Sequence, residues 1–415
     1  RYFAHQGDRA LALARAVAAD SPSGADAELL AGDILRGRDD HAATAAQYRT
    51  YLADRPEGIR LSEARFRLAE ALEHQGEHGD EVIQLYRRIT IADPLSAWAP
   101  QAQARLDALL AALPAADRAR YTTLSAEELV ERGTVYFDNM RNPLSEADFG
   151  AALTAPGGTD ALRCTAAYQY AQSFFKARNR TDAAPAFDAA LPLCRAAGDV
   201  DLQVKSAYQA GRSYAYLNQH ETAAARYAEA ESIDATHSFA DDARLRQAEE
   251  WADLHDDAKV RALLGTLPDA FPTGDMRAEA MWRLAWRAYR DGDLAEATTW
   301  LTKQIETVPI DDNYWAEGQA QYWLGRTWQR RAAAEKSKRA RDEDQVTALE
   351  AYAAAVERYP LSYYAMLALN RLREAAPKRY QALLAQIQSA SVDRDPAAPT
   401  FAFQPRAEYA TPGFA

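Results

Sequence analysis

Apolar and small residues recur along the chain in a pattern that fits one face of a helix. An apolar, a small and a second apolar residue stand at positions i, i+3 and i+6, and from residue 130 the pattern returns every 37 to 40 residues. Residues at this spacing share a helical face, and the small one allows a second helix to approach closely. The pattern occurs at Leu29/Gly32/Leu35, Phe66/Ala69/Leu72, Val130/Gly133/Tyr136, Tyr168/Ala171/Phe174, Tyr208/Gly211/Tyr214, Leu245/Ala248/Trp251, Trp282/Ala285/Ala288 and Tyr322/Gly325/Trp328.

A second amphipathic segment follows these faces after a short polar break. Breaks such as "RNRTD", "NQHET" and "RDGDL" precede "AAPAFDAAL", "AAARYAEAESI" and "AEATTWLTKQI". Several second segments run into a proline, which cannot continue a helix. The sequence therefore predicts an all-α fold of tetratricopeptide-like helix hairpins. Stacked hairpins bury the apolar surface that a single hairpin leaves exposed. We therefore expect a right-handed superhelical solenoid that can curve toward a ring.

Composition and charge exclude several classes of protein. The chain of 415 residues is 48% apolar and 26% charged, as expected for a protein with a core. Its net charge of −12 argues against a general nucleic-acid binder, because phosphate contacts need a basic surface. No apolar run approaches the roughly 18 to 20 residues that cross a bilayer. We expect neither a nucleic-acid partner nor a transmembrane segment.

Residues with catalytic or ligating chemistry form no recognisable motif. The 60 acidic residues are too many for spacing to nominate a catalyst, and no Gly-rich phosphate loop or nucleophile elbow is present. His74 and His78 have the i, i+4 spacing of a helical metal pair, but Gly76 lies between them at an expected helix end. With no third ligand evident, a surface turn is the better interpretation. We expect no catalytic residue, no metal and no cofactor in this chain.

A charged insertion interrupts the repeats near the C-terminal end. Between Arg326 and Arg341 the sequence holds seven basic residues and one acid, Glu335, before "DED" reverses the sign. A solvated helical extension is the simpler interpretation. The alternative is an electrostatic contact for an anionic wall polymer or an acidic partner.

Two segments that begin Pro-Leu-Ser are copies of one helix start. "PLSAWAPQAQARL" at 94–106 and "PLSYYAMLALNRL" at 360–372 share Pro, Leu, Ser, an aromatic, Ala, Ala, Arg and Leu at the same offsets. Ser96 and Ser362 are predicted N-caps, which accept hydrogen bonds from the first turn. Because Tyr364 begins one helical stripe at positions i, i+3, i+4, i+7 and i+8, we expect it to pack rather than to contact a ligand.

Three aromatic-rich segments follow one another in the C-terminal third: "AMWRLAWRAYRDGDLAEA" at 280–297, "AQYWLGRTWQR" at 320–330 and "AVERYPLSYYAMLALNRL" at 355–372. Over about residues 275 to 372 this series resembles the superhelical, non-catalytic domain of the soluble lytic murein transglycosylases. The family has a glycine where this chain has Ala365, which prevents the closest backbone approach. The matching positions, which we expect to be mainly structural, are Trp282, Arg283, Ala285, Trp286, Tyr289, Arg290, Tyr322, Trp323, Gly325, Arg326, Pro360, Ser362, Tyr363, Tyr364, Leu367 and Ala368.

The resemblance implies a periplasmic protein that can be associated with the outer membrane at full length. Its superhelix would guide glycan strands of peptidoglycan to a catalytic domain. That domain carries a glutamate in an E-S-x-F stretch, which this chain lacks, so we expect the chain alone to be inactive. The implied organisation is N-terminal repeats at 1–120, a superhelix at 121–390 and the start of a linker at 391–415. The sequence does not nominate the residues that would bind glycan.

A second hypothesis needs no enzyme. The same repeats fit a tetratricopeptide-like scaffold for protein partners in the cell envelope, which would bind them on a concave helical face.

The two cysteines, Cys164 and Cys194, match no disulfide framework and no zinc motif. Two buried thiols are one interpretation. The other is a disulfide, because each cysteine lies about 15 residues from the turn near Asn179 to Asp182. In an antiparallel hairpin they come level, within the roughly 4.4 to 6.8 Å between Cα atoms that a bridge requires.

Overall fold

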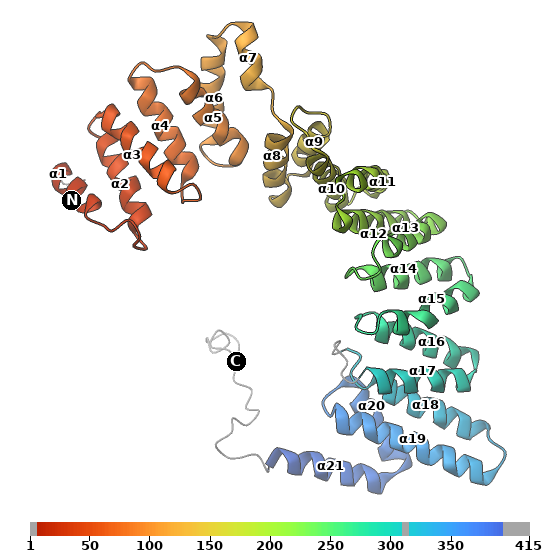
Figure 1. Ribbon diagram of the computed structural model, residues 1–415. Helices are drawn as coiled ribbons and strands as arrows, with labels where there is room; N and C mark the ends of the chain where they lie inside the picture. Colours follow the sequence, from red (N-terminus) through yellow and green to blue (C-terminus); the bar gives the residue numbers. More distant parts are fainter. Residues whose placement is uncertain (1–5, 309–314, 393–415) are drawn as a thin grey trace. The chain divides into compact units, whose positions relative to one another are not determined.

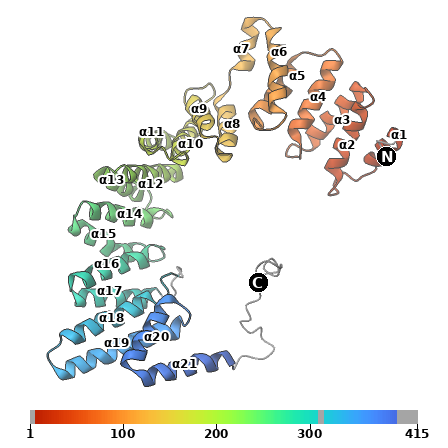
Figure 2. The same ribbon diagram turned by 180° about the vertical axis from the view of Figure 1, so that it is seen from behind.

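The computed structural model describes residues 6–308 and 315–392, and all regular elements in these ranges are helices (Figures 1 and 2). The all-α prediction is therefore confirmed. The chain forms two compact units, Arg1–His237 (unit 1) and Ser238–Ala415 (unit 2). The expected division near residue 120 and the right-handed superhelical course of the whole chain stay predictions. The expected linker at 391–415 lies, from residue 393 on, outside the described residues.

After a first helix, the chain runs through successive pairs of antiparallel helices, as the repeat pattern predicted. Within each unit most helices that follow one another in sequence also contact one another, so stacked pairs cover one another's apolar faces. The helices are α1(Gly7–Arg15), α2(Gly24–Arg36), α3(His41–Asp54), α4(Leu61–His74), α5(Asp80–Ala92), α6(Ala99–Ala111), α7(Ala115–Thr122), α8(Ala126–Asp138), α9(Asn142–Ala152), α10(Asp160–Lys176), α11(Arg180–Ala197), α12(Val200–Tyr216), α13(His220–Ile233), α14(Ala240–Asp253), α15(Asp257–Ala270), α16(Arg277–Asp291), α17(Leu294–Thr307), α18(Gln319–Ala334), α19(Lys338–Arg358), α20(Tyr363–Ala375) and α21(Pro377–Val392).

The small residue of the repeat pattern is where the two helices of a hairpin touch. A methyl group added at Gly211 would lie 2.8 Å from the ring of Tyr227, and one at Gly325 would lie 2.6 Å from the ring of Tyr352. Carbon atoms do not approach so closely, so only glycine fits without a shift of the ring. The same contact joins Gly32 to Tyr48 and Gly133 to Phe149.

The spacing of this contact fixes the length of the hairpin. The large residue follows the small one by 16 positions in Gly32–Tyr48, Gly133–Phe149 and Gly211–Tyr227. In α18–α19 the separation from Gly325 to Tyr352 is 27 positions. The charged insertion therefore accounts for 27 − 16 = 11 extra residues. They lengthen the turn end of the hairpin and leave its middle contact unchanged.

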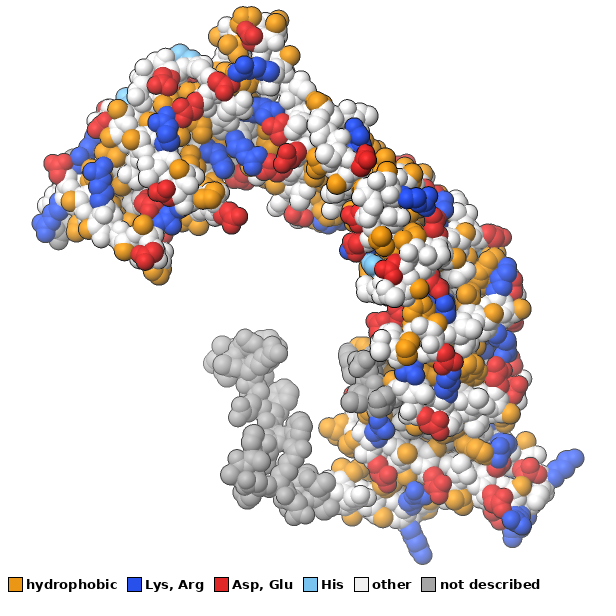
Figure 3. Space-filling model, in the orientation of Figure 1, with side chains coloured by type: hydrophobic (Ala, Val, Ile, Leu, Met, Phe, Trp, Pro, Cys, Tyr) orange, Lys and Arg blue, Asp and Glu red, His pale blue; other side chains and the backbone are white. Residues whose placement is uncertain are grey.

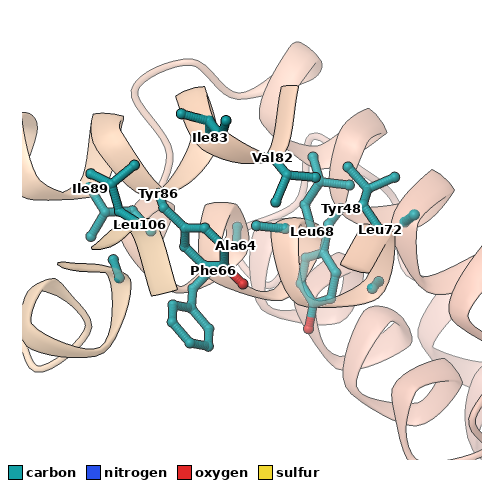
Figure 4. Close-up of a cluster of buried hydrophobic side chains, with 14 of the residues drawn as sticks. Tyr48, Ala64, Phe66, Leu68, Leu72, Val82, Ile83, Tyr86, Ile89 and Leu106 are labelled. Carbon is teal, nitrogen blue, oxygen red and sulfur yellow. The ribbon is translucent and has the colours of Figure 1, made fainter. Parts of the chain in front are cut away.

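The core of unit 1 shows how aromatic residues fill the space between hairpins (Figure 4). Phe66 packs edge-on against Tyr86, 5.4 Å between ring centroids, and its other neighbour is Trp98 at 5.1 Å. The buried hydroxyl of Tyr86 donates to Glu73 at 2.6 Å, because a buried polar group needs a partner. Burial and this bond raise the pKa of the Tyr86 hydroxyl.

Cys164 of α10 and Cys194 of α11 form a disulfide in the structure, with their Cα atoms 4.5 Å apart. Both side chains are fully buried. The bridge joins the open end of the hairpin, opposite the turn at Arg178 and Asn179. Disulfides persist in oxidising compartments and are rare in the reducing cytosol.

Helix starts follow the side-chain chemistry in most hairpins. Ser362 caps α20 as predicted, accepting from the amide of Ala365 at 3.1 Å. The prediction that Ser96 caps α6 is wrong: its hydroxyl donates to the carbonyl of Asp93 at 2.8 Å, and α6 begins at Ala99. In this copy the helix starts three residues after Ser96, with Pro100 in its first turn, where a proline is well tolerated.

Among the described residues, no helix is both long enough and apolar enough to span a bilayer.

Candidate functional site

Half-buried aromatic side chains gather between α16 and α18 of unit 2. Trp282, Trp286 and Tyr289 occupy positions i, i+4 and i+7 of α16 and so share one face. The ring of Trp323 from α18 lies 6.0, 4.7 and 5.2 Å from these three rings, respectively. All four side chains are half-buried. We call them the aromatic band: they hold two helices together and still offer ring surface to a ligand.

The aromatic contacts continue from the band toward α20. Tyr322 is buried, and its ring lies 5.7 Å from Tyr352 and 5.8 Å from Tyr364. The hydroxyl of Tyr364 also accepts from the amide of Gln319 at 2.8 Å. Tyr363, the other member of the pair, is 63% exposed. The adjacent tyrosines thus differ: Tyr364 packs, and Tyr363 lies on the surface.

Two arginines of α16 beside the band form ion pairs with carboxylates. Arg283 forms ion pairs with Glu249 and Glu279, each at 2.7 Å, and Arg287 pairs with Asp257. These partners come from α14, α15 and α16. The charges of these two arginines are therefore compensated by nearby carboxylates.

A pocket of about 640 Å³ lies at the N-terminal ends of α16 and α18, and Trp282 of the aromatic band is part of its wall. We call it the α16 pocket. Its wall comes from α14, the turn before α16, the first turns of α16 and the end of α17. The residues that line it are Leu245, Arg246, Pro272, Thr273, Gly274, Asp275, Met276, Arg277, Ala278, Glu279, Trp282, Arg283, Gln304, Thr307, Val308, Ala316 and Gln319.

Arg277 ties the wall of this pocket together. It donates to the carbonyl of Pro272 at 3.1 Å and to that of Thr307 at 2.8 Å, which joins the turn before α16 to the end of α17. Within the described ranges no carboxylate pairs with it. Among the described residues, the hydrogen bonds of the Arg277 guanidinium therefore go to backbone carbonyls.

The pocket wall also holds polar atoms that lack partners. The Oε1 atom of Gln304 and the Nε atom of Arg277 are buried and make no hydrogen bond to any described residue. Burying an unpaired polar group costs free energy. Because both atoms are closed off from the pocket opening, this cost does not by itself indicate a ligand.

The remaining family-motif positions lie at helix contacts or beside them. The guanidinium of Arg326 is 6.0 Å from the Trp323 ring, and Gly325 contacts Tyr352. Pro360 precedes the Ser362 cap of α20. Ala365, which replaces the family's glycine, is fully buried. These positions do not converge on one cleft.

Candidate metal ligands are sparse in the part of the chain that the structure describes. His74 ends α4, and its ring stacks on His41 at 4.4 Å rather than joining His78. In unit 2 the carboxylates of Asp241, Asp242 and Asp275 come within 4.8 Å of one another. Asp241 already accepts from the Met276 amide at 3.1 Å, and exposed acidic groups often gather without an ion. No metal centre is built on either group.

Sequence reasoning missed the α16 pocket. Its turn, "FPTGDM", reads only as a break between hairpins, and Arg277 and Gln304 lie on different helices. The sequence signal nearest to the pocket was the spacing of the aromatic residues on α16, which form the adjacent aromatic band.

Comparison with known proteins supports the repeat architecture. Residues 246–386, about a third of the chain, match the family model YfiO, described as an outer membrane lipoprotein. This match covers the aromatic band and every residue that lines the α16 pocket except Leu245. A search of curated proteins finds no match.

Solved structures with similar helical folds share little sequence with this chain. YrrB, a tetratricopeptide-repeat protein with an unusual peptide-binding site, is 16% identical, with a TM-score of 0.32, over 57% of this chain and 98% of that one. Yeast Tom70 is 12% identical with a TM-score of 0.32 over 95% and 90%. A signal-transduction ATPase from Pyrococcus horikoshii with a tetratricopeptide-repeat sensor is 12% identical, with a TM-score of 0.40, over 84% and 54%.

Proposed function

We propose that this protein is a tetratricopeptide-like scaffold of the cell envelope that binds a protein partner at the aromatic band and the α16 pocket. The observation that carries the proposal is the joining of the two features by Trp282. A half-buried indole offers a large apolar contact with little loss of side-chain freedom, and such residues dominate binding energy in interfaces.

The polar wall of the pocket complements an extended peptide. Arg246, Arg277 and Arg283 supply donors, whereas Glu279 and Asp275 supply acceptors. An extended backbone presents both carbonyl and amide groups, so it can pair with a wall of mixed charge. A peptide side chain would rest on Trp282.

Two observations favour the envelope. The family model that covers both features is named for an outer membrane lipoprotein. In unit 1 the Cys164–Cys194 bridge fits an oxidising compartment such as the periplasm.

A photo-crosslinking experiment tests the proposal. A photoreactive phenylalanine analogue replaces Thr273, an exposed residue of the pocket rim, and the matched control replaces Thr299, exposed on α17. In cells of the source organism, Thr273 should crosslink to one defined envelope protein and Thr299 should not. Equal crosslinking from both positions, or none from either, would contradict the proposal.

A second candidate is the superhelical domain of a lytic transglycosylase, which would guide glycan strands. The observation that favours it is the order of the three aromatic motifs at Trp282, Tyr322 and Tyr364, together with ring surface that sugars can stack on. The chain would then sediment with purified murein sacculi without dissolving them. Protein that stays in the supernatant would exclude this candidate, and release of anhydro-muropeptides would show a catalytic activity that the sequence does not predict.

A further inference from the structure

Most basic side chains in the second half of unit 1 have an acidic partner. Arg132 pairs with Asp148 at 2.6 Å, and Arg226 pairs with Asp188 at 2.8 Å. Figure 3 shows the same mixing of basic and acidic side chains over α2 to α6. In a chain with a net charge of −12, a group of neighbouring arginines of which none has a carboxylate partner is therefore an exception.

Three arginines at the turn end of α10–α11 form such a group. Arg178, Arg180 and Arg212 form no ion pair with any described residue, although Asp182 lies in the next turn of the chain. The carboxylate of Asp182 accepts instead from the Asn179 amide at 2.6 Å. We call Arg178, Arg180 and Arg212, with Phe175 and Tyr216, the arginine cluster.

The cluster is organised around one aromatic ring. The guanidinium of Arg180 lies 3.5 Å from the centroid of Phe175, and that of Arg212 lies 5.1 Å from the same centroid. Arg180 is also 5.7 Å from the centroid of Tyr216, which is 71% exposed. The π-system of an aromatic ring attracts cations, so Phe175 helps to keep both guanidinium groups close to it.

Neighbouring contacts use only a small part of the donors in the cluster. Arg180 donates to the carbonyl of Phe175 at the end of α10, and Arg212 donates to Gln209 at 3.2 Å. A guanidinium has five N–H groups. The bond to Phe175 explains why one arginine caps α10, but it does not explain why a second is held beside it.

Electrostatics agree with this geometry. Burial, and then the positive charge of Arg212, lower the pKa of the Arg180 guanidinium. Like charges near one another repel, and an anion that binds close to both would relieve the repulsion. The electrostatics of the cluster therefore favour binding of a negatively charged group.

We propose that the arginine cluster binds an acidic segment of a protein partner, with carboxylates on Arg180 and Arg212 and an apolar side chain on Tyr216. Planar guanidinium groups pair with carboxylates through two parallel hydrogen bonds. The site lies wholly within unit 1 and does not depend on the α16 pocket. The proposals for the two sites can therefore be confirmed or contradicted independently of each other.

The test measures binding of a fluorescein-labelled octaglutamate peptide to the full chain by fluorescence anisotropy at low salt. The double variant Arg180→Gln/Arg212→Gln should weaken binding by at least about tenfold, because each substitution removes a guanidinium group that pairs with a peptide carboxylate. The matched control, Arg163→Gln/Arg195→Gln, removes the same charge from exposed arginines that are paired with Asp160 and Glu229. It should weaken binding by less than about twofold, as expected for rim charges.

Every other outcome overturns the proposal. Equal losses in the two double variants would show that net charge alone governs binding. Absence of binding by the native chain would exclude the site. Vesicles of anionic phosphatidylglycerol serve as a third arm: if they compete for Arg180 and Arg212 and the peptide does not bind there, the occupant is a lipid and not a protein segment. Thermal melting of the variants, unchanged from native, controls for folding.

Discussion

The α10–α11 hairpin of unit 1 and the α18–α19 hairpin of unit 2 share one central contact but are secured at different ends. A small residue of the first helix meets an aromatic residue of the second, Ala171 with Phe187 and Gly325 with Tyr352. In α10–α11 a disulfide joins the open end and the turn is short. In α18–α19 the turn end is longer.

The longer hairpin secures its extension with charge. Arg331 near the end of α18 forms an ion pair with Asp344 of α19, and the Arg331 guanidinium also lies 3.7 Å from the Trp328 ring centroid. The comparison teaches that the central contact sets the register of a hairpin, whereas each end is stabilised by whatever local chemistry the sequence provides. Three changes test this division.

The largest effect is expected from the disulfide. Replacing Cys164 and Cys194 with alanine should destabilise α10–α11 by about 3 to 4 kcal/mol, because a closed loop of this length restricts the unfolded chain. Hydrogen exchange of α10 and α11 amides measures the loss locally. Mass spectrometry of the non-reduced native protein is the control. Two free thiols in protein recovered from the periplasm would contradict the bridge.

The central contact should give the next largest effect. Gly325→Leu should cost about 1 to 3 kcal/mol, because the added side chain overpacks against Tyr352. The matched control is Gly265→Ala in α15, where an added methyl group meets nothing within 4 Å. That change should instead stabilise by about 0.5 to 1 kcal/mol, since alanine is the better helix former. An unchanged melting temperature for Gly325→Leu would place the contact elsewhere.

The ion pair of the extension should give the smallest effect, and one that depends on pH. The hydrogen bond from Arg331 lowers the pKa of Asp344 below its usual value. A carboxylate with a lowered pKa contributes stability above its unfolded pKa of about 3.9, and this stability is lost as the pH falls through the folded value. Asp344→Asn should therefore cost about 1 kcal/mol at pH 7, since Arg331 is partly exposed to solvent.

Urea unfolding of the native chain and of Asp344→Asn between pH 7 and pH 2 measures this dependence. The difference between the two should stay constant down to about pH 4 and shrink below it. A difference that does not change with pH would show that Asp344 contributes packing and not charge.

The glycine contacts between helices were predictable from the sequence, whereas only one of the two predicted serine N-caps was correct. Gly211 and Gly325 were identified from spacing alone, because a small residue on an apolar helical face has one common purpose. The N-cap at Ser362 followed from its side chain, but the identical prediction at Ser96 failed. Capping depends on where the preceding turn ends, and at Ser96 the hydroxyl donates back to Asp93.

The candidate sites were less accessible to sequence reasoning. The aromatic band was visible as an i, i+4, i+7 spacing on α16, but its contact with Trp323 joins residues about 40 positions apart. The α16 pocket and the arginine cluster gave no sequence signal that we recognised. Arg180 and Arg212 belong to different hairpins, and nothing in "RNRTD" or "AGRSYAY" indicates that they share a ring.

The sequence by itself determined the helical class, the hairpin period and the positions of close helix contact, because these depend on periodicity and side-chain size within one or two helices. Only the tertiary structure decided that Tyr363 is exposed, that Trp282 borders a pocket, and that Arg180 and Arg212 lack acidic partners among the described residues. Each of these properties depends on how neighbouring helices are placed. Exposure and charge compensation are set by atoms from several helices at once, and no local pattern along one helix contains them.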